Sequence, residues 1–383
     1  MDLRLPDELV AFQDGLRRFV DKELMPHEAR VQRDGMDPVL GRELREKTRA
    51  AGLWLLDLPE ELGGQGLGLL GMTVFWEEIS RTVAVPARDV SVFGPQVGPI
   101  LASLKGVQAE RYLHPVIRGE KHGCFAQTEP EAGADPAGMR TRAVRRDGVY
   151  VLNGRKHFIT AAEKAQFASV FAVTDPVEGN PRPVSCFLVD MDQRGVRISR
   201  RQETMMGERP CEIEFVDVEV PFANLVGDEG GGFRLGQKWI NHGRLRHGAR
   251  ACGVAERCIG LAASFAKQRK TFGATLSERQ AVQWMLADSY TDVHATRLMV
   301  RSAAWRADQG EDIRAESYMV KLFGDEMGFR AADRCMQIHG GMGLTLDLPI
   351  ERFWRDQRSF LITEGPSEVM RMAIARHVLR TYA

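Results

Sequence analysis

The spacing of hydrophobic residues changes twice along this chain of 383 residues, and the two changes limit the folds open to it. Up to about residue 120, apolar residues recur at helical intervals, as Leu9, Phe12, Leu16 and Phe19 do. Between about 121 and 230 the pattern alternates in short runs separated by turn residues. After that, long helical windows return. We therefore expect an α+β protein of three domains, at 1–120, 121–230 and 231–383.

Each domain has its own expected architecture. The first is expected to be all-α, with further helical windows at 70–82 and 108–118. The last is expected to be a four-helix bundle, with long helical windows at 249–266, 276–306, 313–338 and 366–382.

The middle domain is expected to be an antiparallel β-barrel or sandwich, because short strands with hairpin signals follow one another without helices between them. Asp147-Gly148 and Asn153-Gly154 are typical hairpin turns. The expected strands lie at 123–128, 140–146, 149–152, 157–160, 167–173, 184–191, 196–199 and 212–220.

Charge and cysteine content exclude several classes of function. Basic and acidic residues both number 52, so no net field would attract nucleic acid or an anionic membrane. No apolar run reaches the roughly 18 residues of a membrane span, and the start of the chain has no signal-peptide core. We expect a soluble, cytoplasmic protein.

The six cysteines form no Cys-x-x-Cys pair, which predicts reduced and mostly buried thiols. Cys335 and His339 have the spacing of two metal ligands on a helix, but no third ligand accompanies them, and we predict no metal.

A glycine motif at 66–71 fits the dinucleotide-binding fingerprint, and Asp89 lies where a ribose-binding acid would be expected. A Gly-rich loop separates it from the preceding apolar run, and no alternating βαβ series follows. We therefore interpret it as a flexible connection.

Glu364 ends an apolar run, Phe360-Leu361-Ile362, and precedes Gly365-Pro366. Pro366 is expected to open the last helix, so that Glu364 lies on a short, stiff turn. Hydrophobic neighbours would raise the pKa of its carboxyl toward the range of a useful base. The alternative is an acidic residue that offsets the dipole of the helix after it. On this stretch alone the structural interpretation is favoured.

The order of the domains and four motifs together change this interpretation. The motifs are 126–135 (AQTEPEAGAD), 157–160 (HFIT), 269–273 (RKTFG) with Gln280, and 337–343 (QIHGGMG) leading to Glu364. With these motifs the chain resembles the flavin-dependent acyl-CoA dehydrogenase family from about Asp7 to Arg380.

The resemblance implies a set of FAD-binding residues. Phe125, Gln127 and Thr128 would lie at the strand end against the flavin ring. Phe158 and Thr160 would cover the ring, and many relatives have Trp at position 158. On the pyrophosphate and adenosine side they are Arg269, Phe272 and Gln280. A neighbouring subunit would contribute Gln337, Gly340 and Gly341 to the same cofactor, and the last helix would add Ser367 and Glu368.

The resemblance also implies the chemistry. Glu364 would remove the α-proton of an acyl-CoA thioester while the β-hydrogen leaves as hydride to the flavin, which gives a trans-2-enoyl-CoA. A minority of relatives place this base immediately before the arginine that matches Arg244, where this chain has Gly243. Four residues match substrate-side positions: Ala134, Asn241, Arg244 and Gly365. On residue type alone, the basic turn 244–247 would be solvated.

The implied partners are an acyl-CoA, an electron-transfer flavoprotein and further copies of the chain, with a dimer of dimers as the usual state of the family. Two alternatives remain open on the same fold. One is a flavin monooxygenase or oxidase, and the other is a flavoprotein that binds nucleic acid. Ala134, Thr363 and Pro366 depart from common family residues, which predicts an acyl pocket of different shape without defining chain length, branching or ring character.

Overall fold

The computed structural model describes residues 4–86, 89–176 and 179–382. The chain forms two compact units. One consists of residues 1–93 and 241–383 and is called the helical unit below; the other consists of residues 94–240 and is called the strand unit.

The N-terminal part of the helical unit is built from amphipathic helices. In the third of them the Asp37 side chain accepts hydrogen bonds from the N–H groups of Val39 and Leu40, which caps the helix where Pro38 begins it. The elements of this part are α1 (Asp7–Phe19), η1 (Val20–Leu24), η2 (Met25–His27), α2 (Glu28–Asp34), α3 (Pro38–Ala50), η3 (Glu60–Leu62), α4 (Gly68–Ile79) and η4 (Ser91–Phe93).

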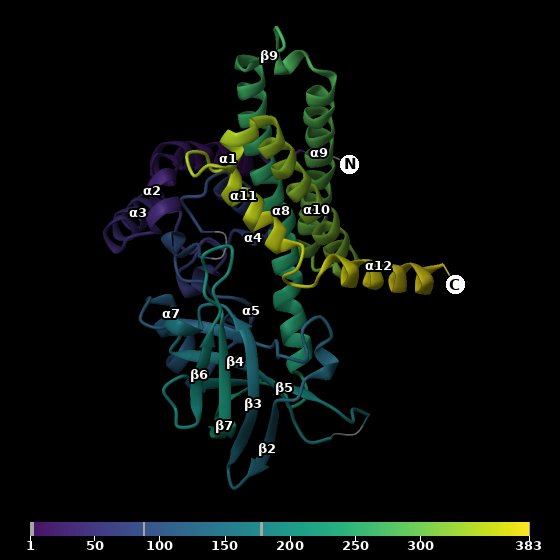
Figure 1. Ribbon diagram of the computed structural model, residues 1–383. Coiled ribbons are helices and arrows are strands. Elements are labelled where there is room, and N and C mark those ends of the chain that lie inside the picture. Colours follow the sequence, from purple (N-terminus) through teal and green to yellow (C-terminus); the bar gives the residue numbers. More distant parts are fainter. Residues whose placement is uncertain (1–3, 87–88, 177–178, 383) are drawn as a thin grey trace. The chain divides into compact units, whose positions relative to one another are not determined.

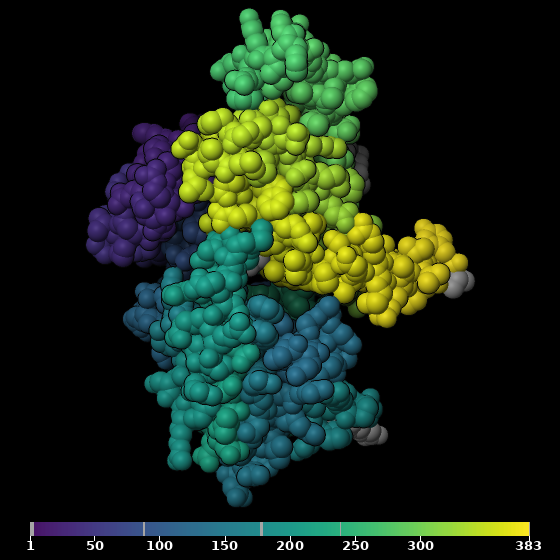
Figure 2. Space-filling model, in the orientation of Figure 1, coloured from purple at the N-terminus to yellow at the C-terminus, as the bar shows by residue number. Residues whose placement is uncertain are grey.

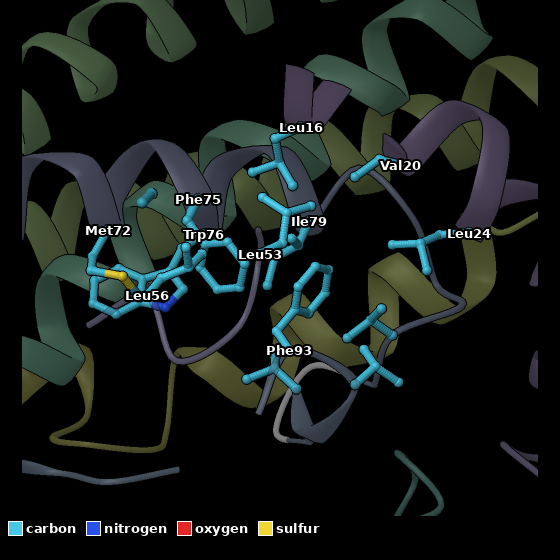
Figure 3. Packing of buried hydrophobic residues seen from close by; sticks show 14 of the residues in the cluster. Leu16, Val20, Leu24, Leu53, Leu56, Met72, Phe75, Trp76, Ile79 and Phe93 are labelled. Carbon is cyan, nitrogen blue, oxygen red and sulfur yellow. The ribbon is translucent and has the colours of Figure 1, made fainter. Parts of the chain in front are cut away.

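One hydrophobic cluster joins these elements to the C-terminal helices of the same unit (Figure 3). Leu16 and Val20, which continue the helical spacing of the N-terminal pattern, are buried in it against Phe75 and Ile79 of α4. Leu245 and Val300 of the C-terminal part belong to the same cluster. The predicted apolar face of the first helix is therefore the face that is buried.

The C-terminal part contains the longest helices. α10 packs against α9, α11 and α12, and a short hairpin connects α8 to α9 (Figure 1). In Figure 2 the last helix, in yellow, forms a surface ridge that leads to the C-terminal end. The elements are α8 (Gly232–Gln268), whose residues up to 240 belong to the strand unit, β9 (Lys270–Thr271), β10 (Ala274–Thr275), η9 (Leu276–Glu278), α9 (Gln280–Asp308), α10 (Arg314–His339), η10 (Gly340–Leu344), α11 (Ile350–Phe360) and α12 (Ser367–Thr381).

The strand unit begins with short helical segments and continues as a sheet. The helical segments are α5 (Pro99–Ala102), α6 (Gly106–Gln108), η5 (Ala109–Leu113) and α7 (His114–Ile117); three single turns, η6 (Pro136–Gly138), η7 (Ala162–Lys164) and η8 (Phe222–Asn224), connect strands. The strands are β1 (Gly123–Ala126), β2 (Arg142–Arg146), β3 (Val149–Ile159), β4 (Phe167–Val173), β5 (Val184–Asp190), β6 (Val196–Arg201), β7 (Cys211–Pro221) and β8 (Leu225–Val226).

The sheet has the order β6-β7-β3-β2-β4-β5-β8, and β1 pairs with β4. Most neighbours are antiparallel, but β1 and β2 each pair with β4 in parallel. The expected fold class, a β domain between two helical regions of the sequence, is confirmed. The middle domain was expected to be an antiparallel barrel or sandwich; over the described residues no closed barrel is found, and the sheet is mixed with an open strand order.

The turn predicted at Asn153-Gly154 is wrong. β3 continues through these residues and pairs with β7 on both sides of a register shift between Leu152 and Gly154. The Asn153 side chain bonds with Asp217 of β7 instead of closing a hairpin. The irregularity is a bulge rather than a chain reversal.

The structure also bears on the predictions for the cysteines, the glycine motif and membrane-spanning segments. All six cysteines are free and buried, as predicted. The interpretation of the glycine motif as a flexible connection is wrong for residues 68–71, because α4 begins at Gly68 and the N–H groups of Leu69 and Leu70 donate to the Asp308 carboxylate. Among the described helices, none is long and apolar enough to cross a membrane. The three-domain division stays a prediction.

Candidate active site around Glu364

Glu364 lies in the tight turn between α11 and α12. The turn is closed by hydrogen bonds from the Thr363 N–H to the Ser359 carbonyl and from the Ser367 N–H to the Leu361 carbonyl. Glu364 has φ of 55° and Gly365 has φ of 104°. A positive φ is uncommon for a residue with a side chain, so the turn holds Glu364 in a constrained conformation. Pro366 was predicted to be the first residue of α12. It occupies the N-cap position instead, and the helix begins at Ser367.

The Glu364 carboxylate faces one side of α8, where Gly243, Arg246 and His247 lie. Arg246 Nη2 donates to Glu364 Oε1 at 2.8 Å, and His247 Nε2 lies 3.6 Å from the same oxygen. The other oxygen, Oε2, is buried and has no hydrogen-bond partner. A Cβ atom at position 243 would overlap that oxygen, so only glycine leaves room for it.

The predicted direction of the Glu364 pKa is wrong. Burial raises the pKa, but the charges and hydrogen bonds of Arg246 and His247 outweigh burial, and the pKa lies well below its ordinary value. The expected apolar surroundings are only partly present, because Ile362 is exposed while Phe360 is buried. The basic turn on α8, expected to be solvated, supplies these cations: Arg246 is about three-quarters buried, and His247 is buried.

Behind His247 lies a buried chain of charged groups on α10. His247 Nδ1 lies 3.1 Å from Asp325 Oδ2, and Lys321 Nζ lies 3.1 Å from the same oxygen. Lys321 also donates to the Phe360 carbonyl at 2.9 Å, which ties α10 to the last residue of α11. Lys321 and Asp325 are fully buried. Lys321, Asp325, His247 and Glu364 thus form a continuous polar path.

The predicted substrate-side residues of the helical unit lie beside this path. Arg244 donates to Asn241 Oδ1 at 3.0 Å, one turn earlier on α8, and its guanidinium covers the Tyr318 ring at 4.8 Å. Arg244 is buried, and burial lowers its pKa. A Cβ atom at Gly365 would lie 3.5 Å from Arg244 Nη2. Asn241, Arg244, Glu364 and Gly365 are therefore brought together.

In the strand unit, a second predicted group lies at the ends of β1 and β3. The Phe125 ring stacks on Trp239 at 5.5 Å and contacts Phe171, and Gln127 Oε1 is buried without a hydrogen-bond partner. The Thr128 carbonyl accepts from the His157 N–H at 2.8 Å, which places Thr128 beside the start of the second motif.

A buried ion pair fixes these strand ends. Lys156 Nζ lies 2.7 Å from Glu129 Oε1 and also donates to the Gln127 carbonyl. The Glu129 carboxylate accepts two further bonds, from the N–H groups of Arg140 and Thr141. The Phe158 ring, in contrast, is 58% exposed, stacks on His157 and belongs to a residue with φ of 55°. Thr160 and Ala134 are exposed.

The third predicted group surrounds the hairpin between α8 and α9. Phe272, at the hairpin tip, is 99% exposed and has φ of 50°. Arg269 and Gln280 are exposed on either side of it. Gly243 and Arg269 are 26 positions apart in sequence, and α8 is continuous up to Gln268, so the two residues lie about 39 Å apart at 1.5 Å per residue. Within one chain, this group is therefore not brought together with Glu364.

The remaining predicted residues lie at helix ends. Gln337, Gly340 and Gly341 are exposed at the C-terminal end of α10, where Gly340 has φ of 58°. Ser367 begins α12, and its hydroxyl is buried without a hydrogen-bond partner, while Glu368 is exposed. A helix N-terminus with an unpartnered hydroxyl suits an anionic group.

Sequence reasoning missed Lys321, Asp325 and Tyr318, and it misjudged Arg246 and His247. Lys321 and Asp325 lie four apart on α10, a spacing that also suits a solvent-exposed helix pair. Nothing in this local spacing distinguishes a buried pair from an exposed one.

The chain is similar to known proteins along nearly its whole length. Models of the acyl-CoA dehydrogenase N-terminal, middle and C-terminal domains match residues 6–120, 124–218 and 230–379. The mitochondrial short-chain specific acyl-CoA dehydrogenase of Mus musculus is 34% identical over 99% of this chain and 92% of its own length. A subunit of the caffeyl-CoA reductase–Etf complex of Acetobacterium woodii is 35% identical over 95% of this chain and 96% of its own.

Among solved structures, butyryl-CoA dehydrogenase from Megasphaera elsdenii matches with a TM-score of 0.85 and 28% identity, over 99% of this chain and all of that one. Sequence and structure therefore agree along nearly the whole length. The chain belongs to the acyl-CoA dehydrogenase family of flavoprotein oxidoreductases.

Proposed function

We propose that this protein is an FAD-dependent acyl-CoA dehydrogenase in which Glu364 removes the α-proton of an acyl-CoA thioester to form a trans-2-enoyl-CoA. The observation that carries the proposal is the asymmetry of the Glu364 carboxylate. Oε1 is held by Arg246 and approached by His247, whereas Oε2 is buried and unpartnered. A base needs one oxygen with a free lone pair in a fixed position, and Oε2 meets that requirement.

The residues of both units fit an FAD. In the strand unit, the unpartnered Gln127 Oε1 and the exposed Phe158 ring suit a polar edge and a flat ring. In the helical unit, the Ser367 hydroxyl at a helix N-terminus and the guanidinium of Arg269 suit phosphate oxygens. Phe125, Thr128 and Thr160 would complete the first group, and Phe272, Gln280, Gln337, Gly340, Gly341 and Glu368 the second. Bound FAD would supply the acceptor for the β-hydride.

The residues of this chain perform the proton transfer. Glu364 ionises readily because Arg246 and His247 lower its pKa, so the base form is present throughout the neutral range. The Glu364 N–H would polarise the thioester carbonyl as negative charge develops on it, a contribution that fixed donors make in many acyl-transfer sites. Arg244, tied to Asn241, would orient the substrate, and the absence of a side chain at 243 leaves Oε2 its space.

More than one copy of the chain is needed in this proposal. Arg269, directly after the end of α8, lies about 39 Å from Gly243, and Phe272 follows it in the hairpin, so both would serve the cofactor of a neighbouring copy. A dimer of dimers would satisfy this need. The exposed Trp284 and Tyr290 of α9 supply apolar surface of the kind that such an interface buries.

An electron-transfer flavoprotein is the proposed acceptor of the electrons. One relative belongs by name to a complex with Etf, and a matched structure is titled for an electron transferring flavoprotein of Acidaminococcus fermentans. The relatives are named for short-chain and for caffeyl substrates, so they support the acyl-CoA class and leave the acyl group open.

Anaerobic mixing of the purified protein with a panel of CoA thioesters tests the proposal. The panel should contain straight, branched, aryl-substituted and carboxylated acyl groups. The expected result is loss of the oxidised flavin spectrum with one class of thioester and formation of its enoyl-CoA. Protein without flavin, or flavin that no thioester reduces, would contradict it. Fast reoxidation of the reduced flavin by oxygen with product bound would favour the monooxygenase or oxidase alternative.

A further inference from the structure

His247 lies between two carboxylates that belong to different elements. Its Nδ1 faces Asp325 Oδ2 at 3.1 Å on α10, and its Nε2 faces Glu364 Oε1 at 3.6 Å on the turn before α12. The ring packs against Phe360, with the centroids 4.6 Å apart, and is buried. Packing and two polar partners leave the imidazole one orientation.

Both contacts of the imidazole ring are attractive only when a second proton is present. A neutral imidazole carries a single N–H and can donate to only one of two carboxylates. With Nδ1 donating to Asp325, the contact between Nε2 and Glu364 Oε1 is attractive only when a second proton lies on one of those two atoms. Lys321 contacts Asp325 at 3.1 Å and so places a cation on the far side of the pair.

Building on the proposed role of Glu364 as the base, we propose that His247 is a positioning residue for Glu364 whose protonation state sets the strength of the base. The proton on Nε2 holds Oε1 and leaves Oε2 free, but the positive charge makes the carboxylate a weaker base. Loss of that proton removes the charge beside Glu364 and strengthens the base.

Several charged groups face this pair. On α8 they are Arg246, which bonds Glu364, and Arg244, whose charge also acts on Glu364. On α10 they are Asp325 and Lys321. On the loop after α3, Asp57 acts on Arg246, and burial raises the pKa of Asp57.

The rate of flavin reduction should depend on pH through the protonation of His247. Burial lowers the pKa of His247, but Asp325 and Glu364 raise it more, so the pKa lies above its ordinary 6.5. Below that pKa His247 is charged and Glu364 is the weaker base; above it the base is stronger. The rate constant for flavin reduction at saturating substrate should therefore rise with pH through an inflection above 6.5.

Two variants of the flavin-loaded, full-length protein test whether His247 causes this inflection. In His247→Gln the inflection should disappear, because the side chain no longer titrates. In Asp325→Asn the anion that raises the His247 pKa is lost, and the inflection should move to lower pH by roughly 1–3 units. Asp292→Asn, which loses an ion pair with Arg330 between α9 and α10, serves as the matched control and should leave the inflection in place. Rates that fall by the same factor at every pH would show a purely structural role and overturn the proposal.

The titration of His247 can also be measured directly, without catalysis. With ¹⁵N-labelled histidine, the imidazole resonance missing from His247→Gln should titrate above pH 6.5 in the wild type and at lower pH in Asp325→Asn. His247→Gln retains the Lys321–Asp325 pair, so it keeps the test open if Asp325→Asn does not fold. A resonance that titrates at or below 6.5 would overturn the proposal.

Failure of this inference differs from failure of the proposed function. If Glu364→Gln reduces its flavin as fast as the wild type, the base assignment itself is wrong. If Glu364→Gln is inactive while the pH profile is the same in the wild type, His247→Gln and Asp325→Asn, only the role of His247 is wrong.

Discussion

At the scale of single residues, the backbone of the turn directs Glu364 toward α8. Positive φ at a residue with a side chain costs about 1–3 kcal/mol and persists only where the surroundings enforce it. Here the turn's hydrogen bonds, the contact with Arg246 and the glycine at 243 enforce it. We infer that the position of Oε2 depends on Gly243 as much as on Glu364.

Gly243→Ala should therefore impair catalysis without unfolding the protein. The new Cβ would overlap Glu364 Oε2 and push the carboxylate from its place, and a misplaced base should lose most of its ~10²–10⁴-fold contribution. Stopped-flow measurement of flavin reduction checks this. Gly260→Ala, on the same helix but with open space around its Cβ, is the matched control and should keep full activity. An active Gly243→Ala would show that Glu364 does not use this position.

Local sequence could predict the turn that carries Glu364 but not the electrostatics of its carboxylate, and on that stretch alone a structural role was favoured. The apolar run and the Gly-Pro step indicated a rigid turn, and that turn is present. The lowered pKa of Glu364 comes from Arg246 and His247, and Arg246 lies 118 residues away in sequence. Only the packing of α8 against the turn brings these charges together, so no local pattern could reveal the sign of the shift.

At the scale of elements, the strand ends that carry Gln127 and Thr128 depend on a buried ion pair. Lys156 and Glu129 are almost fully inaccessible, and their bonds join β3, the end of β1 and the segment before β2. Burial lowers the pKa of Lys156 to about 8 despite Glu129. Removing one member of such a pair leaves the other charge buried without compensation.

Glu129→Gln should consequently cost about 3–5 kcal/mol of unfolding free energy at pH 7, because it leaves the Lys156 ammonium unpaired. The folded-state pKa of Lys156 lies below its unfolded value, so the unfolded state binds more protons and stability rises with pH across that window. The loss in Glu129→Gln should thus be smaller at pH 9 than at pH 7. Urea unfolding at both pH values measures it.

The double variant Glu129→Gln/Lys156→Met should recover part of the loss, since it removes the unpaired charge. Glu326→Gln, which breaks a more exposed pair with Arg371, is the control and should cost little. Equal stability of the single variant and the wild type would mean that the pair is not needed to hold the strand ends.

The sequence predicted most elements because their patterns are local. β4 occupies the predicted residues 167–173, and α10 differs from its predicted window by one residue at each end. The exceptions depend on distant partners. Asn153-Gly154 has the composition of a turn, but pairing with β7 keeps the strand extended through it. The open, mixed sheet likewise depends on β1 and β2 pairing with β4, which strand composition does not encode.

At the scale of the whole molecule, Phe272 is the residue that most clearly lacks a role within one chain. An almost fully exposed aromatic side chain at a positive φ contributes little to the folding of its own unit. We expect Phe272→Ser to leave the free energy of unfolding within about 0.5 kcal/mol of the wild type. It should nevertheless weaken FAD retention, because the proposed site is shared between copies.

Gel filtration with light scattering, together with flavin content after dialysis, measures the effect of Phe272→Ser. Tyr382→Ser, which removes another highly exposed aromatic ring near the C-terminus, is the control and should retain flavin. Unchanged flavin content in Phe272→Ser would contradict a cofactor contact from the neighbouring copy.

Glu364 is the proposed base, and the rate at which the best thioester reduces the flavin of Glu364→Gln tests this role. We predict that this variant retains its flavin and its fold but reduces the flavin at least ~10²-fold more slowly than the wild type. Glu326→Gln, measured in parallel, should behave as the wild type does. A Glu364→Gln protein that binds flavin and reduces it at the wild-type rate would show that Glu364 is not the base.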